Sequence, residues 1–560
     1  MMRTVMGRRA NAAVALLVLL PLWAQAVIHD PRAVEADPSV ASGPIAPRLE
    51  GLGDHAHGVT TRSEDSQYFF NQGLRLTYGF NHSEALRSFK EAVRLDPDNA
   101  MAYWGWALVL GPNLNLPMQN EVAEQAFRAI QEAVLRRDKV SEQERAYIDA
   151  LAVRYAPVAL PDRSNLDVLY AEAMANLWAA YPDDLDAATL YGAALMNLSP
   201  WDYWKGDMSP KPNTARFLPI FESVMERNPN HPGAPHYYIH AVESVHPTRA
   251  EASADVLLNL MPGAGHMVHM PSHIYMRVGR YADSFEVNRR AGDADAAYIT
   301  QCSAQGIYPL NYYPHNLHFK VWAAMFQGRS DVAMQGAREV QSKVPRDMSG
   351  NSFGAFETFL SQPLYVMVRF GRWDEALAEP KPGQGKRFMT GVWHYARGMA
   401  FANTNERKKA RRELRTLRAL IDALPADYAI GFAAAPTLLN IAANLLAGDI
   451  AATNDQFDDA IALLARAARL EDSLRYSEPP DWYFPTRHML GAVLLDGGYP
   501  REAEVIYWED LRKNPKNGYS LFGLKLALEA QGNDAAAAEV SEQFARAWGE
   551  ADVQLSSSRF

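Results

Sequence analysis

The stretch YFFNQGLRLTYGFNHSEALRSFKEAVRLDPDNA, residues 68–100, decides the fold. Within it, Ala85, Phe89 and Ala92 fall on one stripe of a helix. Pro97 ends that helix, because its ring cannot continue the backbone hydrogen bonds. Gly73 lies in the preceding helical stretch. The pattern predicts two short helices joined by a turn.

This unit resembles a tetratricopeptide repeat. In that family small residues such as Gly73 and Ala85 let two antiparallel helices approach, and an aromatic such as Phe89 fills the space between them. Comparable units recur, beginning near Gly279, Gly328, Gly371, Gly491 and Gly523. The resemblance implies an all-α fold: a solenoid of helical hairpins that forms a curved superhelix with a concave groove. Each hairpin would bury its apolar face on its neighbours.

Residues 1–26 have the pattern of a secretory signal peptide. It combines three cations, an apolar stretch and a small-x-small cleavage site: Arg3, Arg8 and Arg9, then Ala12–Trp23, then Ala24–Ala26. No later segment is long and apolar enough to predict a membrane span. We therefore expect an exported protein, periplasmic or secreted.

The rest of the chain divides by composition. An extended lead-in rich in Pro, Gly, Ala and Ser covers residues 27–60, the repeat array 61–550, and a C-terminal tail 551–560. Three insertions interrupt the array at 111–118, 198–211 and 293–314. A histidine-rich segment occupies 231–318 inside it.

Charge and cysteine content restrict the function. The 560 residues carry a net charge of −10, which disfavours nucleic acid, whose binding depends on cationic contacts to phosphate. Small or cationic ligands fit this balance better. Cys302 is the only cysteine, so cysteine-based metal sites are excluded. Any metal ion must be bound by His, Met, Tyr or carboxylate.

Two copies of one histidine pair are the most informative feature. His236 and His240 are spaced i, i+4, and His269 and His273 repeat that spacing 33 residues later. On a helix each pair projects from one face. The offset is close to the repeat length of a helical hairpin, so the four imidazoles should occupy equivalent places on neighbouring repeats.

A common repeat frame adds further candidates. Counted from the start of each repeat, His266 and His315 take position 2, His318 takes position 5, and Glu243 takes position 12. In the tetratricopeptide family such positions line the concave, ligand-binding side. The resemblance therefore places seven imidazoles and one carboxylate on one wall.

These residues predict a transition-metal site. Opposed imidazoles on packed helices can bind one ion at about 2.0–2.1 Å. Eight candidates exceed the four of a simple zinc site, so either some orient the ligands or two ions bind. Copper and zinc are both compatible: Met261, Met267, Met270 and Met276 interleave with the histidines and would favour copper as ligands, or they simply fill gaps between helices.

The motifs FNHSEALRSF, HPGAPHYYIHAVE, MPSHIYMRVGRY and YPHNLHF also resemble a group of exported bacterial tetratricopeptide proteins with a histidine-rich central segment. That group provides no activity to transfer, and the wider family implies a scaffold for peptides or protein tails. Family resemblance thus indicates the fold rather than the function.

Three functions remain open. The first is metal binding through His236, His240, His269 and His273, with Glu243, His266, His315 and His318 in support. The second is a metal-dependent hydrolase or oxidase at the same place, with Glu243 as general base, although the HExxH motif is absent. The third is a metal-free scaffold that binds a peptide or small molecule in a channel lined by aromatic and imidazole rings. The segment PPDWYFPTRH, 479–488, would line the far end of the groove or join two repeats.

Overall fold

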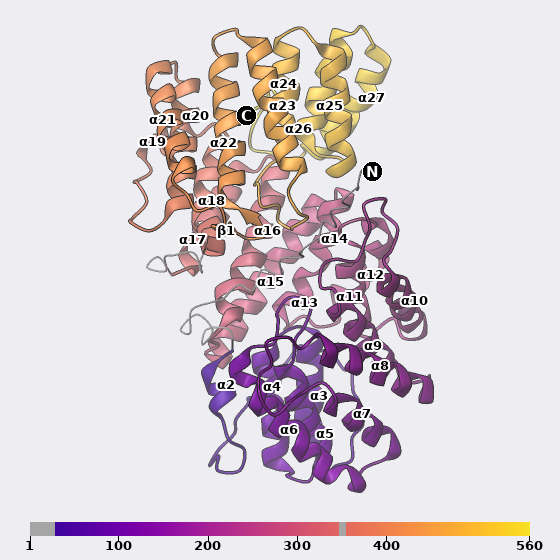
Figure 1. Cartoon of the computed structure of the whole chain (residues 1–560). Coiled ribbons are helices and arrows are strands. Elements are labelled where there is room, and N and C mark those ends of the chain that lie inside the picture. The colour runs from indigo at the N-terminus through magenta and orange to yellow at the C-terminus, as the bar shows by residue number, and fades with distance from the viewer. Residues whose placement is uncertain (1–28, 346–353) are drawn as a thin grey trace, which may run out of the picture.

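Helices make up nearly all regular structure of the chain (Figure 1). The computed structural model describes residues 29–345 and 354–560. Within these ranges the only strand pair is the two-residue antiparallel hairpin of β1 (Ala429–Ile430) and β2 (Ala433–Ala434). The expected all-α class is confirmed. The expected signal peptide lies outside the described residues.

The N-terminal half contains helices α2 to α12, in the order α2 (Pro31–Glu35), α3 (Glu64–Tyr78), α4 (His82–Leu95), α5 (Ala100–Leu110), α6 (Ala123–Arg136), α7 (Glu142–Ala152), α8 (Ser164–Ala180), α9 (Leu185–Asn197), α10 (Pro212–Arg227), α11 (Gly233–Val242) and α12 (Glu251–Leu257). Three 3-10 turns, η1 (Asn120–Val122), η2 (Arg137–Lys139) and η3 (Pro247–Ala250), flank them.

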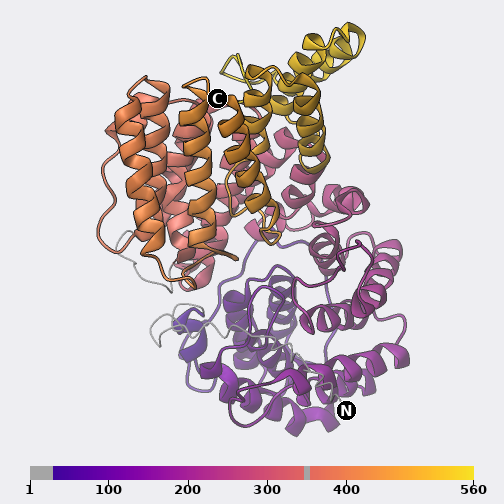
Figure 2. The ribbon, with the colours of Figure 1, turned by 45° about the horizontal axis from the view of Figure 1, so that its top comes forward.

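The central segment contains α13 (Gly265–His269), α14 (Pro271–Val278), α15 (Tyr281–Cys302), the π-turn η4 (Tyr308–Tyr312), α16 (Tyr313–Phe326) and α17 (Ser330–Lys343). The C-terminal half contains α18 (Gly354–Arg369), α19 (Trp373–Ala378), α20 (Arg387–Asn403), α21 (Arg407–Asp422), α22 (Ala435–Ala452), α23 (Phe457–Asp472), α24 (Arg487–Asp496), α25 (Pro500–Lys513), α26 (Gly518–Ala530) and α27 (Asp534–Ala547). Consecutive helices pair as antiparallel hairpins and stack into a curved array (Figures 1 and 2).

A glycine–aromatic–glycine contact joins successive hairpins. A Cβ added to Gly73 would lie 2.8 Å from the Phe89 ring, and one added to Gly105 would lie 2.3 Å from it. Phe89 of α4 is therefore wedged between α3 and α5. The two glycines each lie sixteen positions from Phe89 in the sequence. The same spacing recurs near the other end, where the Tyr507 ring would meet a Cβ on Gly491 at 2.5 Å and on Gly523 at 2.1 Å. Each aromatic ring occupies the space that a glycine side chain leaves empty, and this fit sets the distance between the helices.

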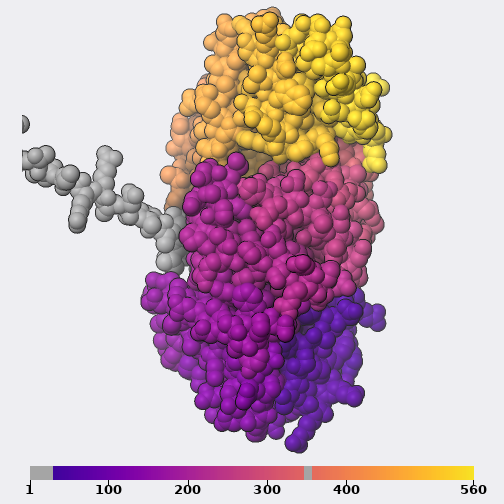
Figure 3. Space-filling model, turned by 90° about the vertical axis from the view of Figure 1, so that its right-hand side faces the viewer, coloured from indigo at the N-terminus to yellow at the C-terminus, as the bar shows by residue number. Residues whose placement is uncertain are grey.

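Two hydrophobic cores divide the molecule. One is built from residues between Ala33 and Tyr312, and the other from residues between Met276 and Val540. Helices α13 to α16 lie where the cores meet, and Ile299 packs against both. Figure 3 shows the same order on the surface, with the central segment between the indigo and yellow ends.

The described part of the lead-in is extended apart from α2 and packs on the helices. Gly263 N–H donates to the Gly51 carbonyl at 2.8 Å, and the ammonium of Lys90 donates to the carbonyls of Ala33, Val34 and Ala36. At the other end, the hydroxyl of Ser558 is buried and donates to the His488 carbonyl at 2.7 Å. Both terminal segments thus lie against the array.

Among the described helices, α22 alone is long and apolar enough to cross a membrane by length and composition. In the structure 83% of that window is buried. It packs against α20, α21 and α23. Helix packing accounts for its apolar composition.

Candidate metal centre

Six of the predicted histidines form two groups of three. The first trio consists of His236 and His240 from α11 and His266 from α13, with one ring nitrogen of each within 4.8 Å of the others. All three side chains are buried. The trio thus joins the i, i+4 pair of one repeat to a single histidine of the next.

The second trio repeats this arrangement one hairpin later. It consists of His269 from α13, His273 from α14 and His315 from α16, again with one nitrogen of each within 4.8 Å. In the repeat frame both trios use positions 5 and 9 of one repeat and position 2 of the following one. The trios touch, because the rings of His266 and His269 lie 5.9 Å apart and those of His240 and His273 lie 5.7 Å apart.

One histidine of each trio is fixed through its Nδ1 atom. His236 Nδ1 lies 2.6 Å from the Tyr78 carbonyl oxygen, and His269 Nδ1 lies 2.6 Å from Asn288 Oδ1. Because Nδ1 donates to an oxygen, the lone pair of each ring is on Nε2. An outer hydrogen bond of this kind orients metal-binding histidines.

In each trio the Nε2 atom of the histidine that is fixed through Nδ1 faces the Nε2 atom of a second histidine. His236 Nε2 is 3.2 Å from His266 Nε2, and His269 Nε2 is 2.9 Å from His273 Nε2. Two nitrogens bound tetrahedrally to one ion at 2.0–2.1 Å lie about 3.3 Å apart. The pairs are therefore close to the separation that a shared ion requires.

Burial keeps these imidazoles neutral at physiological pH. It lowers the pKa of His236 and of His315 to about 4. Burial, followed by the neighbouring imidazoles, lowers the pKa of His240, His266 and His273 well below the usual range. A metal ligand must offer a neutral nitrogen, so this environment favours metal over proton.

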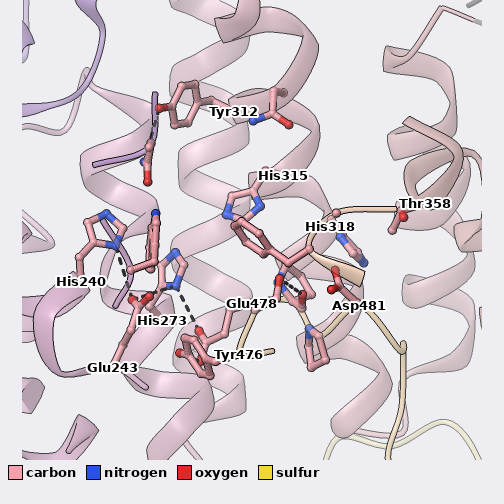
Figure 4. Close-up of a pocket in the computed structure, with 18 of the residues that line it drawn as sticks. His240, Glu243, His273, Tyr312, His315, His318, Thr358, Tyr476, Glu478 and Asp481 are labelled. Atoms are coloured by element: carbon pink, nitrogen blue, oxygen red, sulfur yellow. Dashed lines mark hydrogen bonds and ion pairs between the residues drawn. The ribbon is translucent and has the colours of Figure 1, made fainter. Parts of the chain in front are cut away.

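Two carboxyl groups lie behind the second trio rather than among its ligand atoms (Figure 4). Glu243 Oε2 is 3.2 Å from His273 Nδ1, and Glu478 Oε2 is 3.1 Å from the same nitrogen. Burial raises the pKa of Glu243 well above its usual range, with a further contribution from Glu478, and burial raises the pKa of Glu478 to about 8. With His273 bound through Nε2, its Nδ1–H would donate to this carboxyl pair and orient the ring.

Aromatic rings pack against the histidines of both trios. Phe80 lies 4.4 Å from His236 and 5.6 Å from His266 between ring centroids, and Trp201 lies 5.2 Å from His240. Phe319 covers the second trio, 4.6 Å from His269. Both Phe80 and Trp201 have positive φ, 55° and 62°. This conformation is costly for a residue with a large side chain, and such strain clusters at functional sites.

The trios open into a cavity of about 330 Å³ that both halves of the chain line. Each of the three predicted insertions supplies part of its wall: Asn115 and Leu116, then Trp201, then Ile307, Asn311 and Tyr312. The C-terminal half contributes Thr358, Phe359, the β1–β2 turn and residues 476–481. Insertions that interrupt the repeat therefore build the site.

His318 lines the same cavity but belongs to neither trio. Its ring lies 5.8 Å from Phe359, and burial lowers its pKa to about 3. In the repeat frame it starts a third pair, whose second position is occupied by Trp322. The missing partner explains why the pattern stops at two trios.

The interleaved methionines do not line this cavity. Met261, Met267, Met270 and Met276 are all buried in the hydrophobic cores. A Cβ on Gly79, for example, would meet Met267 at 3.3 Å. They fill gaps between helices, which leaves the described donor sets of the trios composed of imidazole.

A second polar cluster lies next to the first trio. The carboxylate of Asp186 accepts from Tyr78, and lies 2.9 Å from His55 Nε2, 2.9 Å from His57 Nδ1 and 3.2 Å from His231 Nε2. The backbone N–H groups of Gly233 and Ala234 donate to His231 Nδ1, so the proton of that ring is on Nε2 and points at Asp186. This tautomer makes the cluster a hydrogen-bonded network. It fixes Tyr78, whose carbonyl holds His236.

Sequence reasoning missed several residues of this site. Glu478, Asp481, Phe80 and Asn288 were not among the candidates, although the flagged segment 479–488 begins directly after Glu478. Asp481 of that segment lines the cavity, whereas Trp482 and Phe484 belong to the second core. The unusual proline–aromatic segment was the available signal, because Asp481 lies within it and Glu478 directly precedes it.

No family model and no curated protein matches this chain. Among solved structures, the human IFIT1 dimer with m7Gppp-AAAA is 12% identical over 87% of this chain and 91% of that chain, with a TM-score of 0.29. Yeast Tom70 is 13% identical over 86% and 93%, with a TM-score of 0.32. Naa15/Naa10 bound to HypK-THB is 13% identical over 86% and 70%, with a TM-score of 0.23. Likeness at this level assigns no function.

The expectation of no nucleic acid was based on net charge, and the structure shows how unevenly charge is distributed. Helix α21 gathers seven exposed cations in twelve residues: Arg407, Lys408, Lys409, Arg411, Arg412, Arg415 and Arg418. An acidic total therefore does not describe every face of the molecule. The expectation remains a prediction.

Proposed function

We propose that this chain binds two transition-metal ions, one in each histidine trio. The observation that carries the proposal is the duplication: two trios with the same repeat positions, each with one imidazole fixed through Nδ1. Each Nε2–Nε2 contact also fits an N–H···N hydrogen bond between two neutral rings. Such a bond needs only two rings, whereas three imidazoles gather at the same repeat positions twice. A cation shared by the three rings supplies a reason for that arrangement.

Each ion would keep an open coordination position. Three imidazoles leave the fourth position of a tetrahedral ion free. His240, His266, His273 and His315 all line the cavity, so a ligand in the cavity would have access to ions held by these residues. An all-imidazole donor set suits zinc and copper(II), and these are the ions to test.

The test is metal content of the full chain, purified without a histidine tag and reconstituted with zinc or copper. We expect two ions per chain. His236→Ala should leave one ion, as should His269→Ala, because each removes the fixed ligand of one trio. His246→Ala is the matched control, and His318→Ala should also retain two ions. Zero ions in the reconstituted protein would contradict the proposal and favour the metal-free scaffold.

A metal-dependent hydrolase or oxidase is the second candidate. It is favoured by Glu243, which lines the cavity with His273 and whose buried Oε2 atom has no hydrogen-bond partner. In a hydrolase Glu243 would take a proton from a metal-bound water. Glu243→Gln should then retain two ions and abolish turnover of esters or phosphoesters by the loaded protein. Retained turnover would exclude Glu243 as the base.

We also propose that the chain is exported, to the periplasm or the medium, because residues 1–26 carry the three parts of a signal peptide. N-terminal sequencing of the protein from fractionated cells tests this. The expected first residue is Val27, after cleavage at Ala26. A cytoplasmic protein with an intact N-terminus would contradict it.

A further inference from the structure

An unpaired carboxyl group lies across the cavity from His240. Figure 4 shows Asp481 beside His318, on the far side from His240 and Glu243. The backbone N–H groups of Phe432 and Ala433 donate to this carboxyl group, whereas its Oδ2 atom has no hydrogen-bond partner. Gly431 is required there, because a Cβ would lie 2.4 Å from Asp481 Oδ1 and the residue has a φ of 58°. The β1–β2 turn is thus shaped around this acid.

The cavity wall offers Asp481 no cation. Among the described residues that line it there are three carboxyl groups, Glu243, Glu478 and Asp481, and no Lys or Arg. Arg277 approaches Glu478, at 3.7 Å from Oε1, but does not line the cavity. Burial raises the pKa of Asp481 to about 7, and no charged neighbour lowers it. Asp481 is partly buried and its Oδ2 atom is inaccessible, so its charged form is costly unless a ligand supplies a partner.

Aromatic side chains form part of the cavity wall on the side of the acid and on the side of the trios. Phe359 and Phe432 line the cavity near Thr358 and the β1–β2 turn, and Tyr312 and Trp201 line it near the trios. A volume of about 330 Å³ is at the lower end of small-ligand pockets. Aromatic walls also attract organic cations through their ring faces.

We propose that the cavity binds a small organic ammonium ion. Its charged nitrogen pairs with Asp481, its apolar body lies between the aromatic walls, and an oxygen donor at its other end reaches the metal ions. The last contact depends on the proposed metal function. The first two do not.

The experiment is calorimetric titration of the full chain, metal-free and zinc-loaded, with three phenols of equal size. Tyramine carries an ammonium, 4-ethylphenol carries no charge, and 3-(4-hydroxyphenyl)propionate carries a carboxylate. Tyramine should bind at least about tenfold more tightly than 4-ethylphenol, the ratio expected for one desolvated ion pair. The propionate should bind most weakly. Equal affinities of tyramine and 4-ethylphenol in the wild-type protein would overturn the inference.

Asp481→Asn should remove the tyramine preference and leave the ion count at two. Asp427→Asn is the control that should change neither, because Asp427 is an exposed acid on the α21–α22 connection, which also carries the β1–β2 turn. An unchanged preference in folded Asp481→Asn would also overturn the inference. If the wild-type chain binds no metal but still prefers tyramine, the ammonium site stands and the metal function fails. If it binds two ions but does not prefer tyramine, the metal function stands and the ammonium site fails.

Discussion

At the scale of single residues, Gly265 shows how closely the site is packed. A Cβ there would lie 1.9 Å from Asp295 Oδ1, an acid that Tyr308 and Asn316 hold by hydrogen bonds of 2.8 and 2.7 Å. Gly265→Ala must therefore displace either Asp295 or the start of α13, which carries His266. We expect the free energy of unfolding to fall by about 2–3 kcal/mol, as for an overpacked core.

Urea denaturation measures this loss, and metal titration should show weaker binding by the first trio. Gly206→Ala is the control, because nothing lies within 4 Å of the Cβ position and no loss is expected there. Equal stability of the two variants would mean that Asp295 moves aside at no cost.

Asp186 connects the lead-in to the histidine-bearing repeats through its contacts with His55, His57 and His231. Burial alone would raise its pKa, but hydrogen bonds from His231, His55 and His57 outweigh burial and lower it well below the usual range. For His57 burial alone would lower the pKa, but the hydrogen bond and charge of Asp186 raise it. Asp186→Asn should cost about 3 kcal/mol of unfolding free energy, as expected for a broken buried ion pair.

The pH dependence of that cost follows from the two shifts. Stability from Asp186 is present above its unfolded pKa of about 3.8 and is lost as pH falls toward the folded value. Stability from His57 is present below its unfolded pKa of about 6.5 and is lost as pH rises through the raised folded value. The difference between wild type and Asp186→Asn should therefore be largest between pH 4 and 6.5. Chemical denaturation across pH 3–9 checks this, and a flat difference would contradict it.

At the scale of elements, the insertion 198–211 places Trp201 against His240 at the cost of a left-handed backbone. A glycine adopts φ near 62° freely, whereas alanine does not. Trp201→Gly should therefore be more stable than Trp201→Ala by about 1 kcal/mol, the reverse of the usual order. Thermal unfolding of the two variants measures the difference. The usual order, with Ala more stable, would show that the loop relaxes when the ring is removed.

The helical elements could be predicted where their signals are local. Gly73, Phe89 and Pro97 indicated a hairpin, and the structure has α3 and α4 there. This prediction was possible because the small residue, the aromatic residue and the proline that ends the helix all lie within one repeat. The i, i+4 pairs could be read for the same reason. The division of the histidines into two trios could not be predicted, because His266 and His269 both lie on α13 but belong to different trios. That division depends on the rotation between successive hairpins, which spacing along the chain does not encode.

At the scale of the whole molecule, the prediction was limited by sequence separation. Glu478 approaches His273 from more than 200 residues away, and Asp481 joins the cavity only because the two halves curve toward each other. No local pattern carries such a contact. The insertions were recognised as interruptions of the repeat, but their convergence on one cavity appears only in three dimensions.

The contact between His273 and Glu478 makes the candidate metal centre a link between the two halves. Metal loading should therefore slow amide exchange in α11, α13, α14 and α16, and also in residues 475–485 of the C-terminal half, because Glu478 becomes the acceptor for a fixed imidazole. Hydrogen–deuterium exchange with and without zinc measures this. Helices α6 and α21 contribute no residue to the cavity lining and should not change.

Glu478→Gln separates this link from metal binding itself. It should retain two ions and the protection of the histidine-bearing helices, while residues 475–485 exchange at the metal-free rate. Protection of that segment in the variant would mean that ordering of the cavity, rather than the carboxyl group, transmits the effect. Loss of the ion of the second trio, leaving one ion per chain, would instead make Glu478 a ligand, since a residue that only orients His273 changes metal affinity by about 10–100-fold without abolishing binding.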